Sequence, residues 1–202
     1  MHFGGINVAV LINPMRLSGH WDAGYVLDRH IVKSVPLGDD EYGHPQFDNT
    51  RSPIGELLYQ FKYRRNFDCL TEIIDTIDYF LDNVIDMSDF DVIIPVPPTQ
   101  KLRLYQPVFM IANALAVKRK IPYVSNVLAK NSKIESKSLS SVEKRKLNGS
   151  IVKQRKCLRP TNVLLIDDLY GTGCTLNQCT DVLRKDSNIK KIYVLAITKT
   201  KN

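Results

Sequence analysis

In the second half of the chain the apolar positions come in short runs, and between the runs they recur at helical spacing. Short runs that are apolar throughout predict strands buried on both faces, and the longer spaced segments predict helices. The predicted strands cover residues 91–96, 123–127, 163–166 and 192–197, and the predicted helices cover residues 104–117 and 176–183. Buried strands that alternate with helices are typical of a parallel sheet covered on both sides. We therefore predict an α/β fold with a central, mostly parallel sheet flanked by helices.

The first half of the chain is organised differently. Residues 6–12 and 31–35 are rich in Val, Ile and Leu and predict strands. Residues 36–50 are dense in Gly, Pro, Asp and Asn, which predicts a loop. We therefore expect a small β-containing cap or hood over residues 1–50, followed by the main domain over residues 51–202.

Ser52 followed by Pro53 predicts the start of a helix. A hydroxyl can cap the free amides of the first turn, and a proline at the first helical position loses no hydrogen bond. Apolar residues at helical spacing then predict one helix over residues 54–61 and a second over residues 69–81. Each of these helices has one apolar face, as a helix that packs on a core does.

One long segment breaks the alternation of strands and helices. Residues 130–160 are polar, basic and rich in serine, with few apolar positions. Within them, Ser140 and Glu143 fit a capping box and predict a short basic helix at about residues 141–147. A long polar excursion in a compact α/β domain is usually functional or disordered, so we expect a flexible basic loop here.

Length and composition are those of an ordinary soluble globular protein, with 202 residues, 44% hydrophobic and 24% charged. No stretch approaches the roughly 18 to 20 consecutive apolar residues of a membrane span. The first five residues also lack the pattern of a signal peptide. We therefore expect a cytoplasmic protein with no membrane partner. The four cysteines lack the CxxC spacing of zinc sites, which predicts reduced thiols.

Charge is distributed unevenly along the chain, whose formal net charge is +7. Residues 1–100 hold 7 Lys and Arg against 15 Asp and Glu, whereas residues 101–160 hold 15 against 2. A basic middle segment is compatible with an anionic ligand, a nucleic acid or a solvated surface. Charge alone leaves these three interpretations open.

The segment NVLLIDDLYGTGCTL, residues 162–176, carries the strongest chemical signal. Its apolar strand ends in two adjacent carboxylates, Asp167 and Asp168, at the place where a strand of a parallel sheet meets a ligand. The next residues, 171–175, combine glycines and threonine hydroxyls with the free amides of a helix N-terminus, and such groups bind phosphate. The carboxylates can accept hydrogen bonds from a diol such as that of ribose. The segment therefore predicts a site for a ribose 5-phosphate.

LLIDDLYGTGCTL also resembles the signature of the type I phosphoribosyltransferases, enzymes that use 5-phosphoribosyl 1-diphosphate (PRPP) with magnesium. The resemblance implies the type I phosphoribosyltransferase fold, with PRPP and a nitrogenous acceptor as ligands. It implies that Asp167 and Asp168 are the catalytic acids that hold the ribose hydroxyls, with Mg²⁺ bound through PRPP nearby. The residues implied to bind the 5-phosphate are Leu169, Tyr170, Gly171, Thr172, Gly173, Cys174 and Thr175. Gly171 stands where the family usually has Thr or Ser, so one hydroxyl is lost.

Other segments narrow the resemblance to the ComF-like, amidophosphoribosyltransferase-like subgroup. ComF-like proteins are named for a competence protein of bacterial DNA uptake. Three segments of this chain are similar to segments of those proteins: GELLYQFKYRRNF (55–67), DVIIPVPPTQKLRLYQP (91–107) and LSSVEKRKLNGSI (139–151). The resemblance covers residues 52–198. An amidotransferase activity is not expected, because His2 rather than cysteine follows the initiator.

The N-terminus departs from many ComF relatives, because it lacks their four-cysteine zinc element. GHWDAGYVLDRH, residues 19–30, stands in its place. The region is open to three interpretations: a small β cap, an oligomer surface or an acceptor site. We expect its two aromatic residues, Trp21 and Tyr25, to lie in the core rather than to stack on a base.

The resemblance also implies two loops that contact the pyrophosphate. The implied pyrophosphate-binding residues are Pro97, Pro98, Thr99, Lys101 and Arg103, and those of the flexible loop are Lys137, Lys144 and Arg145. Cationic side chains there would stabilise the charge of the leaving pyrophosphate. The two prolines remove backbone amides where related loops bind pyrophosphate, so Thr99 and the side chains would supply more of the contacts.

The predicted function is transfer of the phosphoribosyl group from PRPP to a nitrogen nucleophile, with release of pyrophosphate. One alternative is a non-catalytic regulatory module that binds PRPP or a nucleotide. Another is a ComF-like accessory protein that handles DNA, which the basic segment 101–160 favours. The identity of the acceptor and the formation of a homodimer stay open.

Overall fold

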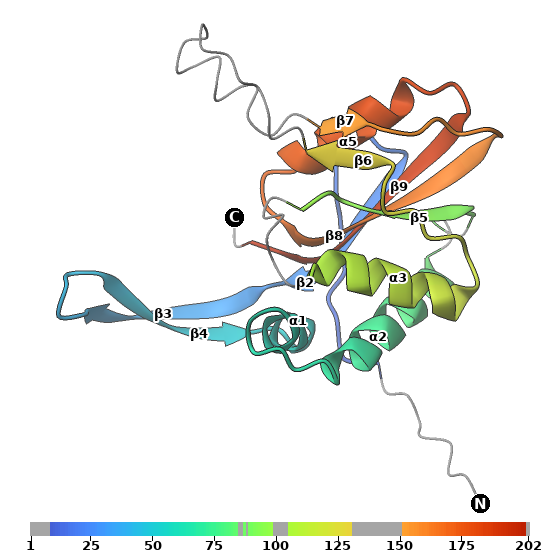
Figure 1. Cartoon of the computed structure of the whole chain (residues 1–202). Coiled ribbons are helices and arrows are strands. Elements are labelled where there is room, and N and C mark those ends of the chain that lie inside the picture. The colour runs from blue at the N-terminus through green and yellow to red at the C-terminus, as the bar shows by residue number, and fades with distance from the viewer. Residues whose placement is uncertain (1–8, 85–86, 88, 99–104, 131–150, 201–202) are drawn as a thin grey trace, which may run out of the picture.

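The computed structural model describes residues 9–84, 87, 89–98, 105–130 and 151–200. A five-stranded sheet in the order β1-β2-β9-β8-β5 runs through the molecule (Figure 1). Its strands are β1 (Met15–Arg16), β2 (Ala23–Arg29), β5 (Val92–Pro95), β8 (Thr161–Tyr170) and β9 (Ile189–Lys199). Strands β2, β9, β8 and β5 are parallel, and β1 is antiparallel to β2. The predicted α/β class with a mostly parallel central sheet is confirmed.

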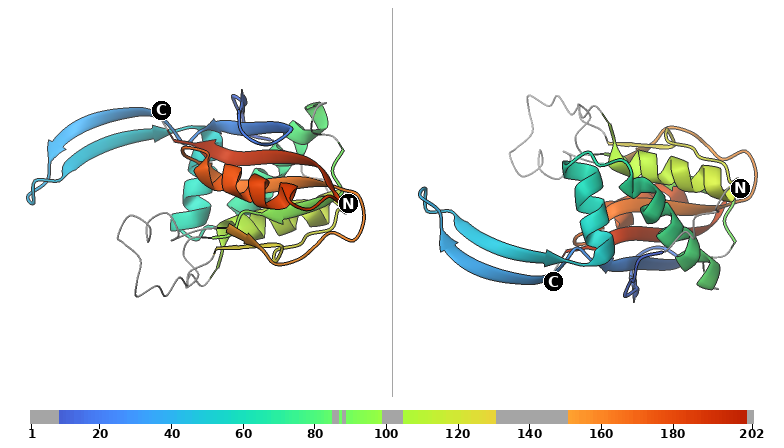
Figure 2. Two further views of the ribbon diagram at one scale, coloured as in Figure 1. Left: turned by 90° about the horizontal axis from the view of Figure 1, so that it is seen from above. Right: turned by 90° about the horizontal axis from the view of Figure 1, so that it is seen from below.

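Helices cover both faces of this sheet. The helices of one face are α1 (Pro53–Tyr63), α2 (Cys69–Asn83) and α3 (Pro107–Arg119), and that of the other is α5 (Cys174–Arg184). Figure 2 shows the two layers from opposite sides of the molecule. The apolar side chains of the first three helices form one buried cluster with the sheet, and those of α5 form a second. The arrangement matches the prediction of a sheet flanked by helices.

Strand β8 shows how one apolar run serves both layers. Leu164 and Ile166 belong to the cluster under α1, α2 and α3, whereas Val163 and Leu165 belong to the cluster under α5. All four side chains are fully buried. Because side chains alternate along a strand, the two residues that follow must also face opposite layers. The alternation therefore directs Asp167 toward the α5 layer and Asp168 toward the α1 layer.

Helix α1 begins where its sequence signal predicts. The backbone amide of Gly55 donates to Ser52 Oγ over 3.1 Å, and Ser52 Oγ donates to the carbonyl oxygen of Arg29 over 2.6 Å. A side chain on Gly55 would place its Cβ 2.5 Å from the carbonyl oxygen of His30. The start of α1 is therefore tied closely to the end of β2. Both helices expected in this part of the chain, over residues 54–61 and 69–81, are confirmed.

The N-terminal region differs from its prediction. Residues 1–8 lie outside the described part, and residues 9–14 have no regular structure, so the expected strand at residues 6–12 is wrong for its described residues. A strand forms instead at Ala23–Arg29, where it pairs in parallel with β9. Both segments carry a short run of apolar residues, so the sequence alone does not show which of them forms a strand. Pairing with β9 selects residues 23–29. Residues 15–29 thus add two strands to the central sheet.

The core position expected for Trp21 is confirmed, whereas Tyr25 is half-buried and packs against the edge of the core. Trp21 is only 8% exposed, and its Nε1 donates to the carbonyl oxygen of Leu17 over 3.1 Å. Tyr25 packs edge-on against Phe80 of α2, with 5.6 Å between ring centroids. The two residues anchor the N-terminal strands on opposite faces of the sheet.

The loop expected at residues 36–50 is a β-hairpin instead. Strands β3 (Ile31–Asp39) and β4 (Pro45–Arg51) pair antiparallel and extend away from the central sheet as an arm (Figures 1 and 2). The strand at residues 31–35 was expected, and it continues four residues further to Asp39. Both strands are largely exposed, so they lack the buried, alternating pattern that identifies a strand. That residues 1–50 act as a hood over a ligand stays a prediction.

The segment after α3 also corrects one prediction. Residues 123–127 form a single bridge, between Ile93 and Tyr123, rather than a strand. The chain then forms β6 (Leu128–Lys130), which pairs antiparallel with β7 (Ile151–Lys153). The predicted basic helix at residues 141–147 and most of the expected flexible loop lie outside the described residues. Within the described part, no helix is long and apolar enough to cross a membrane.

Candidate functional site

A cavity of about 380 Å³ lies at the carboxyl ends of β5 and β8. Its walls come from segments far apart in the sequence: the end of α1, the residues after β5, the start of α3, Lys130 of β6, and the end of β8. Both Asp167 and Asp168 line it. In an open α/β sheet, ligands bind at this edge. The cavity is therefore the candidate functional site.

Asp168 is held by a lysine from the neighbouring helix. Nζ of Lys62 lies 2.8 Å from Oδ2 of Asp168, and the side chains are only 10% and 19% exposed. The backbone carbonyl of Asp168 also accepts a hydrogen bond from Oγ1 of Thr198 over 3.2 Å. This ion pair follows from the alternation along β8, which turns Asp168 toward α1. Sequence reasoning ended this helix at residue 61 and gave Lys62 no role, since no local pattern says which strand the helix meets.

Asp167 sits in a different electrostatic environment. Burial, and then the negative charge of Asp168, raise the pKa of Asp167 to about 7. The backbone amide of Asp168 donates to Oδ1 of Asp167 over 2.9 Å, and this bond and the charges of Lys62 and Lys130 oppose the shift. On the α5 side, burial and the charge of Asp167 raise the pKa of Cys179 to about 12. The adjacent carboxylates therefore differ: Asp168 has a cationic partner, whereas Asp167 keeps its proton to a higher pH than an ordinary carboxyl does.

A smaller hollow of about 170 Å³ adjoins the cavity and is lined by Asp167 and residues 169–176. It lies at the N-terminus of α5, where Gly173 occupies the cap position with a φ of 77°. Gly173 has no side chain to cap this helix, and the amide of Cys174 makes only a long contact of 3.5 Å to Oγ1 of Thr172. The first amides of a helix have no intrahelical acceptor, so they stay available to a ligand. Amides and a positive helix end favour an anion. The hollow has the size and chemistry for a phosphate group.

The two glycines of this turn are not equivalent. A Cβ on Gly173 would lie 2.7 Å from Oη of Tyr170, and its φ lies in the left-handed region that favours glycine. A Cβ on Gly171 would meet nothing within 4 Å. The shape of the turn therefore requires glycine at position 173. Position 171 has open space, and the type I phosphoribosyltransferases that the motif resembles usually carry a hydroxyl there.

The implied pyrophosphate residues are only partly described. Pro97 and Pro98 line the cavity beyond β5. Thr99, Lys101 and Arg103, and Lys137, Lys144 and Arg145 of the expected flexible loop, lie outside the described residues. The described cations at the cavity are instead Lys62 and Lys130, and sequence reasoning assigned a role to neither of them.

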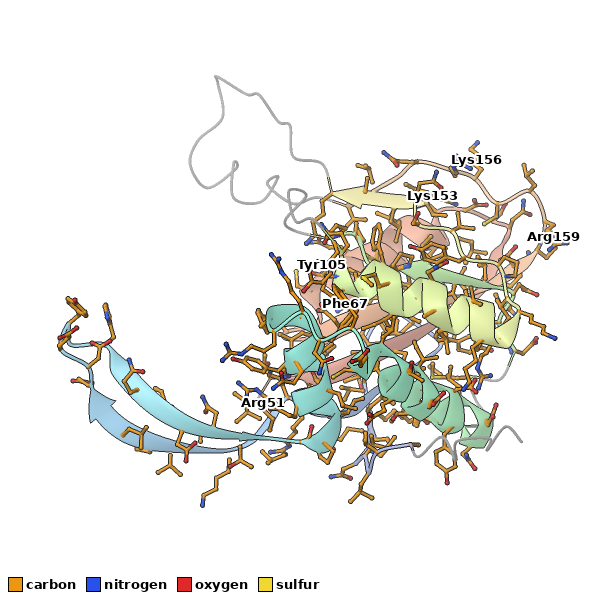
Figure 3. The ribbon with its side chains drawn as sticks, turned by 60° about the horizontal axis from the view of Figure 1, so that its bottom comes forward. Arg51, Phe67, Tyr105, Lys153, Lys156 and Arg159 are labelled. Atoms are coloured by element: carbon orange, nitrogen blue, oxygen red, sulfur yellow. The ribbon has the colours of Figure 1, made fainter. Side chains whose placement is uncertain are left out.

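An aromatic cluster supports the end of α1. Oη of Tyr105 donates to the carbonyl oxygens of Phe61 and Lys62, over 3.1 and 2.8 Å. Its ring packs edge-on against Phe67, with 5.4 Å between centroids, and Figure 3 shows both residues beside the helix end. The last carbonyls of a helix have no intrahelical donor, and two of them share the single hydroxyl proton of Tyr105. Tyr105 thus fixes the helix turn that carries Lys62.

His30 lies behind the site at the end of β2. Its Nδ1 is 3.4 Å from Oγ1 of Thr198, which in turn contacts the backbone of Asp168. Burial, followed by the charges of Arg51 and Lys62, lowers the pKa of His30 below its ordinary value. The lowered pKa favours the neutral form of the imidazole.

The two carboxylates fit the divalent ion that the sequence resemblance implies. Carboxylate oxygens are the ligands that Mg²⁺ prefers, and Mg²⁺ is usually held by one or two carboxylates together with substrate phosphates. Asp167 and Asp168 line the same cavity beside a phosphate-sized hollow. These residues could hold Mg²⁺, directly or through water, when a phosphorylated ligand brings it.

Comparison with known proteins shows the fold. No protein-family model and no curated protein sequence matches the chain. Among solved structures, an adenine phosphoribosyltransferase is similar with a TM-score of 0.50 and 12% identity, over 84% of this chain and 85% of that one. The Trypanosoma brucei adenine phosphoribosyltransferase, solved with AMP, pyrophosphate and ribose-5-phosphate, also has a TM-score of 0.50 and 12% identity, over 93% and 75%. The chain therefore has a fold like that of the type I phosphoribosyltransferases.

Proposed function

We propose that this protein binds PRPP with Mg²⁺ at the carboxyl edge of its sheet and transfers the phosphoribosyl group to a nitrogen nucleophile. The observation that carries the proposal is the contiguity of two spaces: the acidic cavity and the phosphate-sized hollow share Asp167, Leu169 and Thr175 in their walls. A sugar phosphate has a diol at one end and a phosphate at the other, which suits this pair of spaces. The fold likeness to solved phosphoribosyltransferases supports the same ligand.

In the proposed reaction the first turn of α5 holds the 5-phosphate, and Asp167 and Asp168 accept hydrogen bonds from the ribose hydroxyls. The acceptor nitrogen forms a bond to C1 of the ribose, while the bond from C1 to the pyrophosphate oxygen breaks and the pyrophosphate leaves with the electron pair. The proton of the acceptor nitrogen passes to solvent or to the departing pyrophosphate. Positive charge that develops on the sugar lies beside the two carboxylates. Mg²⁺, when bound, would neutralise part of the negative charge of the phosphates. Lys62 and Lys130 stabilise the departing pyrophosphate from the cavity wall.

The proposal is tested by binding and then by turnover. Calorimetry should show PRPP binding in the presence of Mg²⁺, and binding should be lost in the double variant Asp167→Asn with Asp168→Asn. Pyrophosphate release should then be measured with adenine, guanine, hypoxanthine, orotate, uracil and ammonia as acceptors. Absence of PRPP binding to the intact protein would contradict the proposal.

Two features favour the second candidate, a non-catalytic module that senses PRPP or a nucleotide. Pro97 and Pro98 line the cavity and have no backbone amide to offer a pyrophosphate. Gly171 likewise brings no hydroxyl to the phosphate. Tight PRPP binding without pyrophosphate release with any of the acceptors would favour the sensing module over the enzyme.

A ComF-like role in DNA handling stays a prediction. Arg155, Lys156 and Arg159 are exposed on the segment that follows β7, and Figure 3 labels the last two. Cations on an exposed segment bind phosphate backbones in a salt-dependent way. Affinity for single-stranded DNA that falls steeply with salt would support this role, and salt-insensitive or absent binding would remove it.

A further inference from the structure

A second large cavity lies at the opposite edge of the sheet from the candidate functional site. Its volume is about 760 Å³, and its lining consists of residues 151–157, Val182 and residues 185–188. Residues 151–157 precede β8 and residues 185–188 precede β9, so the cavity lies at the amino edge of these parallel strands. It adjoins the end of α5, whereas the phosphate-sized hollow adjoins the start of that helix, which is about 16 Å long. The two sites are therefore separate.

The lining of this amino-edge cavity is held in place around Asp186. The side chain of Asp186 is only 9% exposed, pairs with Nζ of Lys153, and accepts a hydrogen bond from the amide of Cys157 over 2.8 Å. Nδ2 of Asn188 donates to the carbonyl oxygen of Cys157, also over 2.8 Å. These bonds tie the segment after β7 to the turn between α5 and β9, and β7 itself lies beside α5 (Figure 1). The cavity is thus formed before any ligand binds, which lowers the entropic cost of binding.

The lining carries an excess of positive charge. It contains four cations, Lys153, Arg155, Lys156 and Lys185, and one carboxylate, that of Asp186. The carboxylate neutralises Lys153. The other three cations are exposed, and no described residue forms an ion pair with any of them. Three cations that are left unpaired around one concave surface favour an anion with several negative charges.

Part of the lining is apolar. Ile151 is buried in the cluster under α5, and Cys157 and Val182 pack against that cluster. Val152 adds a side chain that is 38% exposed. The volume lies in the range of about 300 to 1,000 Å³ that is usual for small-molecule sites, which combine an apolar lining with a few polar groups. The lining therefore suits an anion that also has an apolar body, which PRPP and inorganic phosphates lack.

We propose that the amino-edge cavity binds a nucleoside triphosphate, with its phosphates at Arg155, Lys156 and Lys185 and its base against the apolar part of the lining. Three cations offset most of the charge of a triphosphate, and arginine can donate two parallel hydrogen bonds to a phosphate. A concave space suits one nucleotide better than a nucleic-acid strand, which needs a groove that follows its backbone. The site is independent of the proposed PRPP site, because the two share no lining residue.

Removal of the three cations tests the proposal on the full chain. Calorimetry with ATP should show binding to the wild-type protein without added Mg²⁺, a condition that disfavours phosphate binding beside Asp167 and Asp168. The triple variant Arg155→Gln, Lys156→Gln, Lys185→Gln should raise the dissociation constant for ATP at least about tenfold. The double variant Asp167→Asn with Asp168→Asn should bind ATP as wild type does. Inorganic triphosphate should bind at least severalfold more weakly than ATP, because it has no base to place on the apolar lining.

A matched control neutralises three exposed cations elsewhere, Arg29→Gln, Lys33→Gln and Lys120→Gln, and should keep ATP binding unchanged. Circular dichroism checks that every variant is folded. Absence of ATP and GTP binding to the wild-type protein up to about 1 mM overturns the proposal. Equal weakening in the control overturns it too, because net charge alone then explains the binding.

Two further results would contradict the nucleotide site. The first is ATP binding that persists in the triple variant and is lost in the Asp167 and Asp168 variant, since ATP would then occupy the carboxyl edge. The second is binding of a single-stranded oligothymidylate that depends on the three cations while ATP does not compete, since the surface would then bind a strand. Neither measurement uses PRPP, so failure of this proposal is distinguishable from failure of the proposed function.

Discussion

Lys62 at the end of α1 and Asp168 at the end of β8 form a short ion pair, with 2.8 Å between Nζ and Oδ2. The pair explains how the chain tolerates two adjacent acids at the edge of a buried strand. One carboxylate is neutralised by a cation from the α1 layer, and the other, facing the opposite layer, takes up a proton more readily. The repulsion between neighbouring charges is thereby reduced before any ligand binds.

Replacing Lys62 by Gln should destabilise the protein and weaken PRPP binding. The substitution leaves Asp168 without its cationic partner in a largely buried position, which costs on the order of 1 to 3 kcal/mol of unfolding free energy. It also removes a positive charge from the cavity, so the dissociation constant for PRPP should rise at least about tenfold. Chemical denaturation and calorimetry measure the two effects. Lys185→Gln, at the exposed end of α5, is the matched control and should change neither quantity.

Gly171 and Gly173 should respond oppositely to an added side chain. Gly173→Ala puts a Cβ against Tyr170 in a left-handed turn, so it should cost at least about 1 kcal/mol of stability and disturb the phosphate hollow. Gly171→Ala meets open space and should leave stability nearly unchanged. Thermal unfolding distinguishes the two variants. Equal losses for both would show that the turn has a different conformation.

Gly171→Ser should strengthen binding of the 5-phosphate. The position has room for a hydroxyl, and a hydroxyl there adds a hydrogen bond to a charged ligand, worth on the order of 1 kcal/mol. We expect the dissociation constant for ribose 5-phosphate to fall severalfold in calorimetry. Gly171→Ala controls for the loss of glycine flexibility and should not tighten binding. An unchanged affinity in the serine variant would place the phosphate away from this turn.

The pKa of about 7 at Asp167 makes stability depend on pH in a defined direction. The folded carboxyl keeps its proton up to about pH 7, whereas in the unfolded chain it ionises near its ordinary value of about 4. The folded state therefore binds more protons between these values, and the free energy of unfolding falls as pH rises from about 4 to 7. Asp167→Asn removes this contribution. Relative to wild type, that variant should gain on the order of 4 kcal/mol between about pH 4 and pH 8.

Denaturation of wild type and Asp167→Asn in parallel across this range isolates the contribution of the one carboxyl, since all other groups titrate in both proteins. A stability difference that does not vary with pH would show that Asp167 is ionised throughout. PRPP binding offers a second check. Hydroxyl donors favour the ionised carboxylate, so binding near pH 7 should release a fraction of a proton, measurable by calorimetry in buffers of different ionisation enthalpy.

Much of the fold could be predicted because its signals are local. The Ser52 cap, the apolar periodicity of α1 and α2 and the uninterrupted runs of β5, β8 and β9 each lie within a few residues, and the structure confirms all of them. The sequence did not predict the hairpin formed by β3 and β4, because that hairpin leaves no such local signal. Its strands are exposed on both faces, so burial imposes no pattern on residues 36–50, and their glycines, prolines and acids predict a loop.

Of the candidate site, the sequence by itself determined the adjacency of Asp167 and Asp168 and the glycine turn that opens α5. Period-two alternation along β8 also determined that the two carboxylates face opposite layers. Only the tertiary structure decided that Lys62 meets Asp168, that Lys130 joins the cavity, and that Asp167 is buried enough to titrate near pH 7. Ion pairing and burial depend on distances through space, and packing of α1 against β2 and β9 creates those distances between segments far apart along the chain.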